Sequence, residues 1–225
     1  MLLSRMARAV AREAADHPLT WRACHAVRDL LGGDGASLTI ENSTPDRVTL
    51  CATDDRSAML ENLQDVLGEG PGMDAFDSGQ SQAAGLDPVA EARWPQFIPA
   101  AGRVIGAGAF LWSLPMCSDG LVIGSICLYR RGASQLAEPL AGAEFLASAV
   151  AATLLRDPEA LSDEAGSAWS SRAVVHQAAG MLVGKLGVST GQALAMLRSR
   201  AFTAGRELRD IAQDVVERRL DLSAS

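Results

Sequence analysis

The sequence predicts an α+β protein in which a central antiparallel sheet flanked by helices precedes a separate unit of three helices. Short apolar runs of strand type occur before residue 130, whereas only helical periodicity occurs after it. Residues 157–167 are acidic, small and rich in helix breakers, which is typical of a boundary. We therefore expect a sheet domain at residues 1–156, a linker at 157–167 and a helical module at 168–225.

The first predicted elements are two helices and two strands. Apolar residues at helical spacing predict two helices within residues 2–31, separated at His17-Pro18 because proline interrupts a helix. Short strands are predicted at Ala36–Glu41 and Val48–Thr53, on either side of a polar turn at residues 42–46.

A helix predicted at Ser57–Val66 leads into a long segment of mixed character. Residues 68–103 are rich in Gly, Pro and Asp and lack sustained periodicity, so we expect an irregular excursion across one face of the sheet. Strands are then predicted at Val104–Leu114 and Leu121–Tyr129, joined by a loop at residues 115–120 as an antiparallel hairpin.

The second strand of this hairpin is apolar on both faces. Strand alternation places Val122, Ile126 and Leu128 on one face and Ile123, Cys127 and Tyr129 on the other. Such a strand is expected at the centre of the sheet, covered on each side. An Ala- and Leu-rich helix predicted at Ala137–Arg156 provides cover for one face or contacts a partner copy.

Three helices are predicted in the helical module. The first spans about Ser170–Leu186, and the second begins at a capping box formed by Ser189 and Gln192 and ends near Gly205. The third spans about Glu207–Arg219. Helices joined by such short turns must be neighbours, so the module is expected to be compact.

Charge is divided unevenly along the chain, whose formal net charge is −7. Residues 1–166 carry 12 Arg against 22 acidic residues, a net −10, whereas residues 167–225 carry 7 Arg and one Lys against 5 acidic residues, a net +3. Any contact with a polyanion is therefore expected in the helical module. An ordinary solvated helical surface is the alternative explanation.

Nothing in the sequence predicts a membrane segment. The longest apolar stretch without charge lies between Arg103 and Asp119, is interrupted by Gly and Pro, and is shorter than the ~20 residues that a span needs. Arginines at positions 5, 8 and 12 interrupt the beginning of the chain before a signal-peptide core could form. We expect a cytoplasmic protein without membrane contact.

Metal, cofactor and catalytic chemistry are not expected either. The cysteines contain no C-x-x-C pair and no nearby histidine, so they indicate neither a zinc site nor a disulfide framework; they are Cys24, Cys51, Cys117 and Cys127. Most are expected to act as small apolar residues, with a redox-responsive pocket as the alternative. No Ser-His-Asp or Cys-His arrangement stands out, so we do not expect an enzyme.

Three motifs in the sheet domain resemble a GAF domain of the actinobacterial regulatory type. They are G-E-G-P at residues 68–71, R-W-P at 93–95 and G-S-I-C-L-Y at 124–129, within a match over about residues 20–155. The resemblance implies a sensory domain that could bind a small molecule. Related sequences often carry Cys after G-E-G-P, where this chain has Gly72, so thiol chemistry is not expected there.

The helical module resembles an ANTAR domain over about residues 168–222. The matching pieces are R-A-V-V-H-Q-A-A-G-M-L at residues 172–182, G-V-S at 187–189 and R-E-L-R-D-I-A at 206–212. This resemblance implies an RNA-binding module that recognises paired hairpins in leader RNA and acts as a transcription antiterminator. It also implies a homodimer, in which the sensory domain controls the module.

The resemblance places RNA contacts on small, aromatic and basic residues of the module. The implied RNA-binding residues are Gln177, Ala178, Gly180, Arg198, Ala201, Phe202, Arg206 and Arg209. An exposed Phe can stack on a base, and Arg can stack or pair with phosphate. Ala178 and Ala201 also lie on helical apolar stripes, so burial between helices explains them equally well.

One departure concerns a basic position of the module. Many ANTAR sequences carry Lys after the Q-A pair, whereas this chain has Ala179. Loss of that charge would remove a phosphate contact and predicts reduced or altered RNA affinity.

Three aromatic residues of the sheet domain are candidates for lining a ligand cleft. They are Trp94, Phe110 and Trp112, for which an aromatic core position is the alternative.

Two other functions remain open at the level of sequence. The helical module could act as a DNA-binding helix-turn-helix, although its second helix is mostly Ala, Leu and Met besides Arg198 and Arg200. The chain could also be a degenerate sensor that dimerises without binding nucleic acid, which would agree with Ala179 and the small basic excess.

Overall fold

The computed structural model describes residues 1–14, 16–41, 47–156, 174–175 and 177–221. The polar turn expected at residues 42–46, the linker expected at 157–167 and the start of the first module helix lie outside the described residues.

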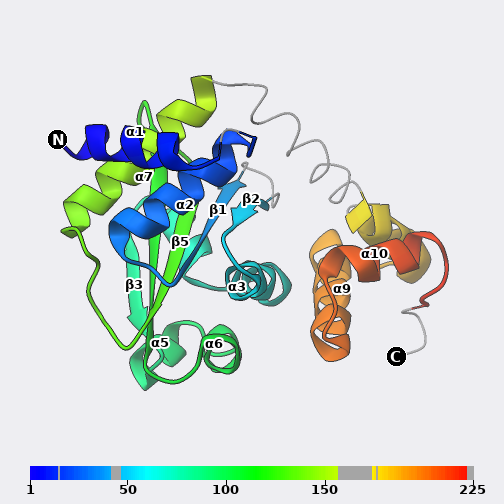
Figure 1. Cartoon of the computed structure of the whole chain (residues 1–225). Coiled ribbons are helices and arrows are strands. Elements are labelled where there is room, and N and C mark those ends of the chain that lie inside the picture. Colours follow the sequence, from blue (N-terminus) through cyan, green and yellow to red (C-terminus); the bar gives the residue numbers. More distant parts are fainter. Residues whose placement is uncertain (15, 42–46, 157–173, 176, 222–225) are drawn as a thin grey trace.

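Seven helices and five strands are described in the sheet domain (Figure 1). They are α1 (Leu2–Arg12), α2 (Leu19–Leu31), β1 (Gly35–Glu41), β2 (Arg47–Ala52), α3 (Asp55–Leu67), α4 (Pro71–Ser78), β3 (Gln82–Gly85), α5 (Pro88–Arg93), α6 (Phe97–Ile105), β4 (Ala109–Ser118), β5 (Leu121–Arg131) and α7 (Leu140–Arg156). In the helical module, residues 174–175 and 177–186 are helical, followed by α9 (Thr190–Ala204) and α10 (Leu208–Val216).

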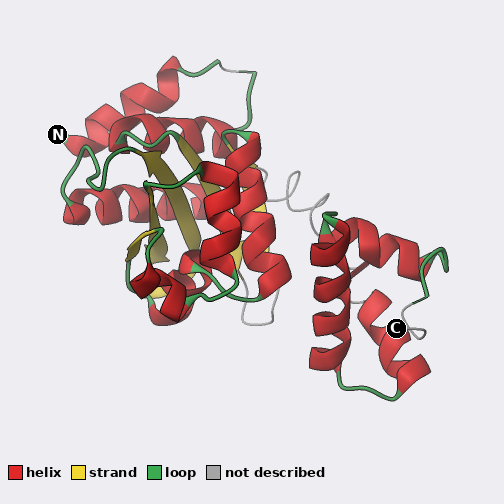
Figure 2. Ribbon diagram, turned by 90° about the horizontal axis from the view of Figure 1, so that it is seen from below, coloured by secondary structure: helices red, strands yellow, loops and turns green. Residues whose placement is uncertain are grey.

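The five strands form one antiparallel sheet in the order β2-β1-β5-β4-β3. Helices cover both faces: α2 and α7 pack on one, with α1 lying over them, and α3 to α6 lie on the other (Figure 2). The expected α+β class with a central antiparallel sheet and a helical C-terminal region is confirmed. The expected central position of the second hairpin strand is confirmed as well, because β5 lies in the middle of the sheet.

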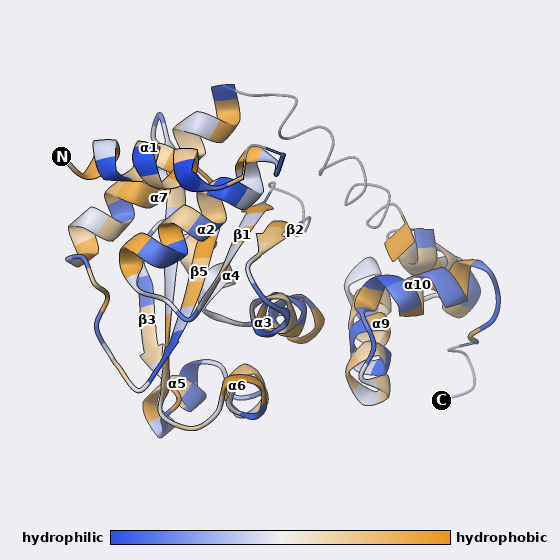
Figure 3. Cartoon of the chain, in the orientation of Figure 1, coloured by the Kyte–Doolittle hydropathy of each residue, from blue (hydrophilic) through white to orange (hydrophobic). Residues whose placement is uncertain are grey.

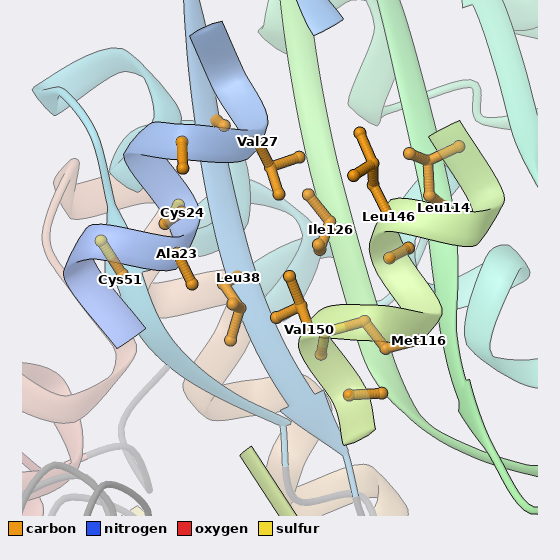
Figure 4. Close-up of a cluster of buried hydrophobic side chains, with 14 of the residues drawn as sticks. Ala23, Cys24, Val27, Leu38, Cys51, Leu114, Met116, Ile126, Leu146 and Val150 are labelled. Atoms are coloured by element: carbon orange, nitrogen blue, oxygen red, sulfur yellow. The ribbon is translucent and has the colours of Figure 1, made fainter. Parts of the chain in front are cut away.

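An apolar core fills the space between the sheet and the α2–α7 layer (Figure 4). Val27 of α2 and Leu146 of α7 meet Leu38 of β1 and Ile126 of β5, all of them fully buried. Figure 3 shows α7 mostly in hydrophobic colours, as expected for a helix that buries most of one side. Each buried Val, Leu or Ile contributes about 1.5–3 kcal/mol relative to an exposed one, so this layer fixes α7 on the sheet.

The irregular excursion expected at residues 68–103 is wrong, because this segment contains α4, β3, α5 and α6. These elements span only four to nine residues each, too few to show a period in the sequence. Local signals define them instead. The Asp87 carboxylate accepts hydrogen bonds from the amides of Val89 and Ala90 at 3.0 Å, which starts α5, and Gly79 ends α4 at φ 65°.

The predicted hairpin has different limits in the structure. Residues 104 and 105 belong to α6, and β4 continues through Pro115 to Ser118, so the turn is Asp119-Gly120 alone. Both turn residues have positive φ, 50° and 79°, as a two-residue hairpin turn of type I′ requires. Pro115 is tolerated because β3 pairs only with residues 110–113 of β4, which leaves the amide side of Pro115 without a partner strand.

A β-bulge changes the face assignment at the start of β5. The register shifts between Met116 and Cys117, so Ile123 packs against the same core as Ile126. Val122 instead points toward Gly79 of α4. The expectation that Val122 shares a face with Ile126 is therefore wrong, because one extra residue reverses the alternation.

The close approach of β1 and β5 at Gly124 gives a prediction. A Cβ on Gly124 would overlap the carbonyl oxygen of Thr39 and lie 2.8 Å from the Ile40 Cα, and both obstacles are backbone. Gly124→Ala should destabilise the sheet domain by about 1–3 kcal/mol, measured by chemical denaturation.

Gly184→Ala is the matched control, since Gly184 is exposed, helical and has open space around an added Cβ. It should be neutral or stabilising by up to about 1 kcal/mol. Equal stability of Gly124→Ala and the unchanged chain would contradict this strand pairing.

Candidate functional site

Small and branched apolar side chains form the core of the helical module. The buried members are Ala178, Ala179, Leu182, Ala193, Leu197, Ala201, Ile211, Ala212 and Val215, joined by Val66 of α3. The predicted capping box starts α9: the Gln192 amide donates to Ser189 Oγ at 3.2 Å, and the Ser189 amide donates to Gln192 Oε1 at 2.9 Å. Alanines at these core positions let the helix axes approach closely.

Burial corrects part of the expected RNA-binding set. Ala178 and Ala201 are fully buried between the helices, so this arrangement places both in the core of the module, as the alternative explanation has it. Ala179, which stands where many ANTAR sequences have Lys, is buried as well. It fills a position in the core of the module.

Five residues of the expected set lie on the surface. They are Gln177, Gly180, Phe202, Arg206 and Arg209. Phe202 is 46% exposed at the end of α9, an unusual position for a large apolar side chain, whereas a Cβ on Gly180 would meet no atom within 4 Å. A flat aromatic ring and an open helix surface are features that an unpaired base can use.

Acidic neighbours partly compensate the basic residues. The Asp214 carboxylate accepts from Arg206 Nη1 at 2.7 Å and from Arg219 Nε at 2.8 Å, and these hydrogen bonds lower the pKa of Asp214 below its ordinary value. Lys185 pairs with Asp221 at 2.7 Å. Within the described residues, Arg209 makes no ion pair, so its charge is fully available.

Arg198, one of the expected RNA-binding residues, is not fully exposed. The side chain is partly buried against the end of α3. Its Nη1 would lie 3.2 Å from a Cβ atom added to Gly68, the residue that ends this helix. Its Nε has no hydrogen-bond partner. The sequence could not predict this position because Gly68 belongs to the other domain.

The sheet domain contains a cavity with a volume of about 10 Å³ beneath α3. This volume accommodates one water molecule, far less than a ligand pocket. Its lining residues are Ser37, Ser57, Leu60, Gln64, Pro71, Phe97, Leu111, Trp112, Ser113, Cys127, Leu128 and Tyr129. The Ser57 hydroxyl is buried here without a hydrogen-bond partner.

Of the three aromatic residues proposed for a ligand cleft, Trp112 alone lines this cavity. Trp94 is a core residue whose Nε1 donates to Asp74 at 3.2 Å, with the Arg93 guanidinium 4.4 Å from the ring centroid. Phe110 packs on Trp112 with ring centroids 4.7 Å apart. The structure therefore places Trp94 in the core and Phe110 against Trp112, and neither residue lines the cavity.

A buried ion cluster next to the cavity was missed by the sequence analysis. The Arg47 guanidinium donates to Glu41 at 2.7 Å and to Glu61 and Asp65 at 2.8 Å each. Ser37 and Thr39 of β1 also donate to Glu61, at 2.7 and 3.2 Å. The signal was present in α3, where Ser57, Glu61 and Gln64 form a polar stripe at spacings of four and three residues.

Three carboxylates around one guanidinium leave excess negative charge in a buried place. Desolvation raises the pKa of Glu41 to about 7, and repulsion from Glu61 and Asp65 adds to this, against the lowering effect of Arg47. Burial likewise raises the pKa of the Cys127 thiol far above its usual range. The raised pKa favours the thiol form of Cys127 over the thiolate, which is the nucleophilic form of cysteine.

The glycine after G-E-G-P has a structural reason. The Gly72 amide donates to Gln64 Oε1 at 2.6 Å, and a Cβ at this position would lie 2.9 Å from both Gln64 Oε1 and Cys127 Sγ. A cysteine side chain does not fit here without displacement of its neighbours, so the absence of thiol chemistry at position 72 has a steric basis.

Fold and surface together define an α+β protein with an antiparallel sheet domain and a helical C-terminal module. Residues 163–216 match the family model described as the ANTAR domain, so the chain carries an ANTAR domain over these residues. The match includes the exposed Phe202, Arg206 and Arg209. None of the curated proteins compared matches the chain.

Solved structures of similar fold have low sequence identity. A domain of a protein assigned as a two-component sensor histidine kinase from Sinorhizobium meliloti is 17% identical with a TM-score of 0.44, covering 60% of this chain and 86% of that one. Chromophore-binding domains of bacteriophytochromes are 14% identical with a TM-score of 0.42 for Stigmatella aurantiaca, covering 69% and 60%. The chromophore-binding domain of the R. palustris bacteriophytochrome is 13% identical with a TM-score of 0.44, and the match covers 70% of this chain and 62% of that one.

None of the helices formed by the described residues has the length and apolar character to cross a membrane. The described residues also bring together no group of three or more His, Cys, Asp or Glu that could hold a metal ion.

The Arg47 cluster predicts a pH dependence of stability. Because the pKa of Glu41 is about 7 in the folded chain and near 4.5 ordinarily, the folded state binds this proton more tightly. Its contribution to stability is fully present below about pH 4.5 and is lost as pH rises through about 7. The free energy of unfolding should therefore fall between pH 6 and 8 by roughly 1 kcal/mol from this group.

Glu41→Gln should remove this fall, as measured by urea denaturation at both pH values. Asp77→Asn removes an exposed carboxylate of α4 and is the matched control, which should keep it. The same pH dependence in Glu41→Gln as in the unchanged chain would show that another group is responsible.

Proposed function

We propose that the chain is a signal-responsive RNA-binding regulator that acts by transcription antitermination at leader RNA hairpins. At the level of the family, the ANTAR domain supports RNA binding and antitermination. The observation that carries the proposal is that this domain exposes Phe202, Arg206 and Arg209 on a compact helical scaffold. Such a regulator acts in the cytoplasm, where the nascent transcript is formed.

The chemistry of the exposed groups supports RNA in preference to duplex DNA. Bases in hairpin loops are unpaired and can stack on Phe202, whereas the bases of a duplex are stacked on one another. Arg206 and Arg209 supply positive charge for the phosphates. A DNA-reading helix would require several polar side chains directed at base edges, and the exposed residues of α9 are mostly small.

The sheet domain is proposed to sense a small molecule. The support is the mostly apolar cavity beneath α3, where the buried Ser57 hydroxyl lacks a partner. Since the cavity has room for one water, a ligand would have to displace α3 or α4 in order to enter, and this would couple binding to a change of shape.

RNA binding is tested by titrating the full chain with tandem-hairpin RNA, scrambled RNA and duplex DNA at a stated salt concentration. We expect preference for the hairpins. Phe202→Ala should weaken this binding by about 5- to 150-fold through loss of stacking, and Arg206→Ala should lower the salt dependence by about one charge.

Matched controls are Leu121→Ala, an exposed apolar residue of the β4–β5 hairpin, and Arg103→Ala, an exposed arginine of α6. Both should bind as the unchanged chain does. Equal affinity for duplex DNA would favour a DNA-binding regulator, and no preference for hairpins would contradict antitermination.

We also propose that the chain acts as a homodimer, so that two modules grip two hairpins. The support is exposed apolar surface on α7, where Phe145 and Leu155 are each 48% exposed, and on α1, which contacts α7 and carries the exposed Leu3. A second copy of this chain is the occupant that presents the same apolar surface in return.

Sedimentation velocity should show a dimer that Phe145→Glu converts to monomer. Val89→Glu places the same charge on an exposed apolar position of α5 and should leave the dimer intact. A dimer unaffected by Phe145→Glu would place the interface elsewhere.

A further inference from the structure

The helix α3 carries an apolar residue on the side that faces away from the sheet. Ser57 and Gln64 point toward the cavity, and at 100° per residue Val66 lies on the opposite side of the helix. Val66 is nevertheless only 4% exposed, because it belongs to the apolar cluster of the helical module. Met59, seven residues earlier on the same side, is 55% exposed.

The cover over Val66 comes from α9, which contacts α3 on its outer side (Figure 1). Arg198 of α9 lies at the C-terminal end of α3, where Gly68 ends the helix with a φ of 69°. The carbonyl groups at this end carry partial negative charge, and α3 has no basic residue of its own in the last turn. Asp65 adds a further attraction for the guanidinium.

This position removes Arg198 from the surface that is available to RNA. The guanidinium is partly buried and its Nε lacks a partner, and desolvation lowers the pKa of Arg198 against the opposing effect of Asp65. Phe202 follows Arg198 by one helical turn, so the two residues share a face of α9. RNA that stacks on Phe202 and continues to Arg198 would therefore collide with α3.

We propose that α3 holds α9 in a docked state that is incompetent for full RNA contact, and that α9 must leave α3 before the module grips its hairpins. This proposal rests on the proposed function and adds its regulation. The docked contact involves α3 with α9 and, to a smaller extent, α10, and Val66 is the single residue of α3 in the apolar cluster of the module, so a modest signal can release it. The same α3 lines the cavity with its inner side, which places the sensing and docking surfaces on one rigid element.

The test compares Val66→Asn with Met59→Asn in the full chain. Both variants place the same polar, uncharged side chain on the outer side of α3, but Val66 alone is covered by α9. Val66→Asn should bind tandem-hairpin RNA roughly 5- to 10-fold more tightly, because a larger fraction of the chain is competent to bind. Met59→Asn should bind as the unchanged chain does, and Val66→Ala should show the same gain in smaller size.

Small-angle X-ray scattering without RNA provides an independent measurement. Release of the module should increase the radius of gyration of Val66→Asn but not of Met59→Asn. If the unchanged chain and Val66→Asn bind hairpin RNA with the same affinity and have the same radius of gyration, docking is overturned, while RNA binding stands. If neither the unchanged chain nor any variant prefers hairpin RNA, the proposed function fails. Docking is then decided by the radius of gyration alone: an increase for Val66→Asn supports docking, and an unchanged radius contradicts it.

Discussion

The position of α3 depends on the ion cluster around Arg47. Its guanidinium at the start of β2 binds Glu41 of β1 together with Glu61 and Asp65 of α3, so one side chain connects the edge of the sheet to the helix above it. Removing four charged groups from water is costly, and the cost is offset only while all the hydrogen bonds are made together. The cluster therefore favours one placement of α3, which sets both the cavity beneath the helix and the surface offered to the helical module.

How much of the fold could be predicted depended on how local its signals were. The capping box of Ser189 and Gln192 lies within four residues and was predicted correctly, as were the long helices, whose apolar stripes extend over several turns. The segment before β4 was wrong because its elements are too short for periodicity. The β-bulge at Ile123 of β5 could not be predicted, because it arises from the pairing of two strands and leaves no mark in either one.

The sequence was enough to locate the candidate site in the helical module, but not to say which of its residues are exposed. The family resemblance identified the helical module, but alanines serve equally well in a core and at an interface, so the sequence could not separate buried Ala178 and Ala201 from exposed Gly180. Arg198 and the Arg47 cluster depend on residues from distant segments, and no spacing in the chain reports such contacts. The charge count identifies the module as the more basic part of the chain, although Asp214 offsets two of its arginines.

Both sides of α3 are packed, the inner one against the sheet domain and the outer one against the helical module, and this limits which substitutions the helix can accept. A surface helix ordinarily tolerates neutral substitutions on its solvent side, whereas here the inner side is constrained by Gln64 and Glu61 and the outer side by Val66. Homologues that retain the module should accordingly keep an apolar residue at the outward position. Lineages that lose the module should accumulate polar residues there, which turns this single position into a marker of whether the two halves evolve as one unit.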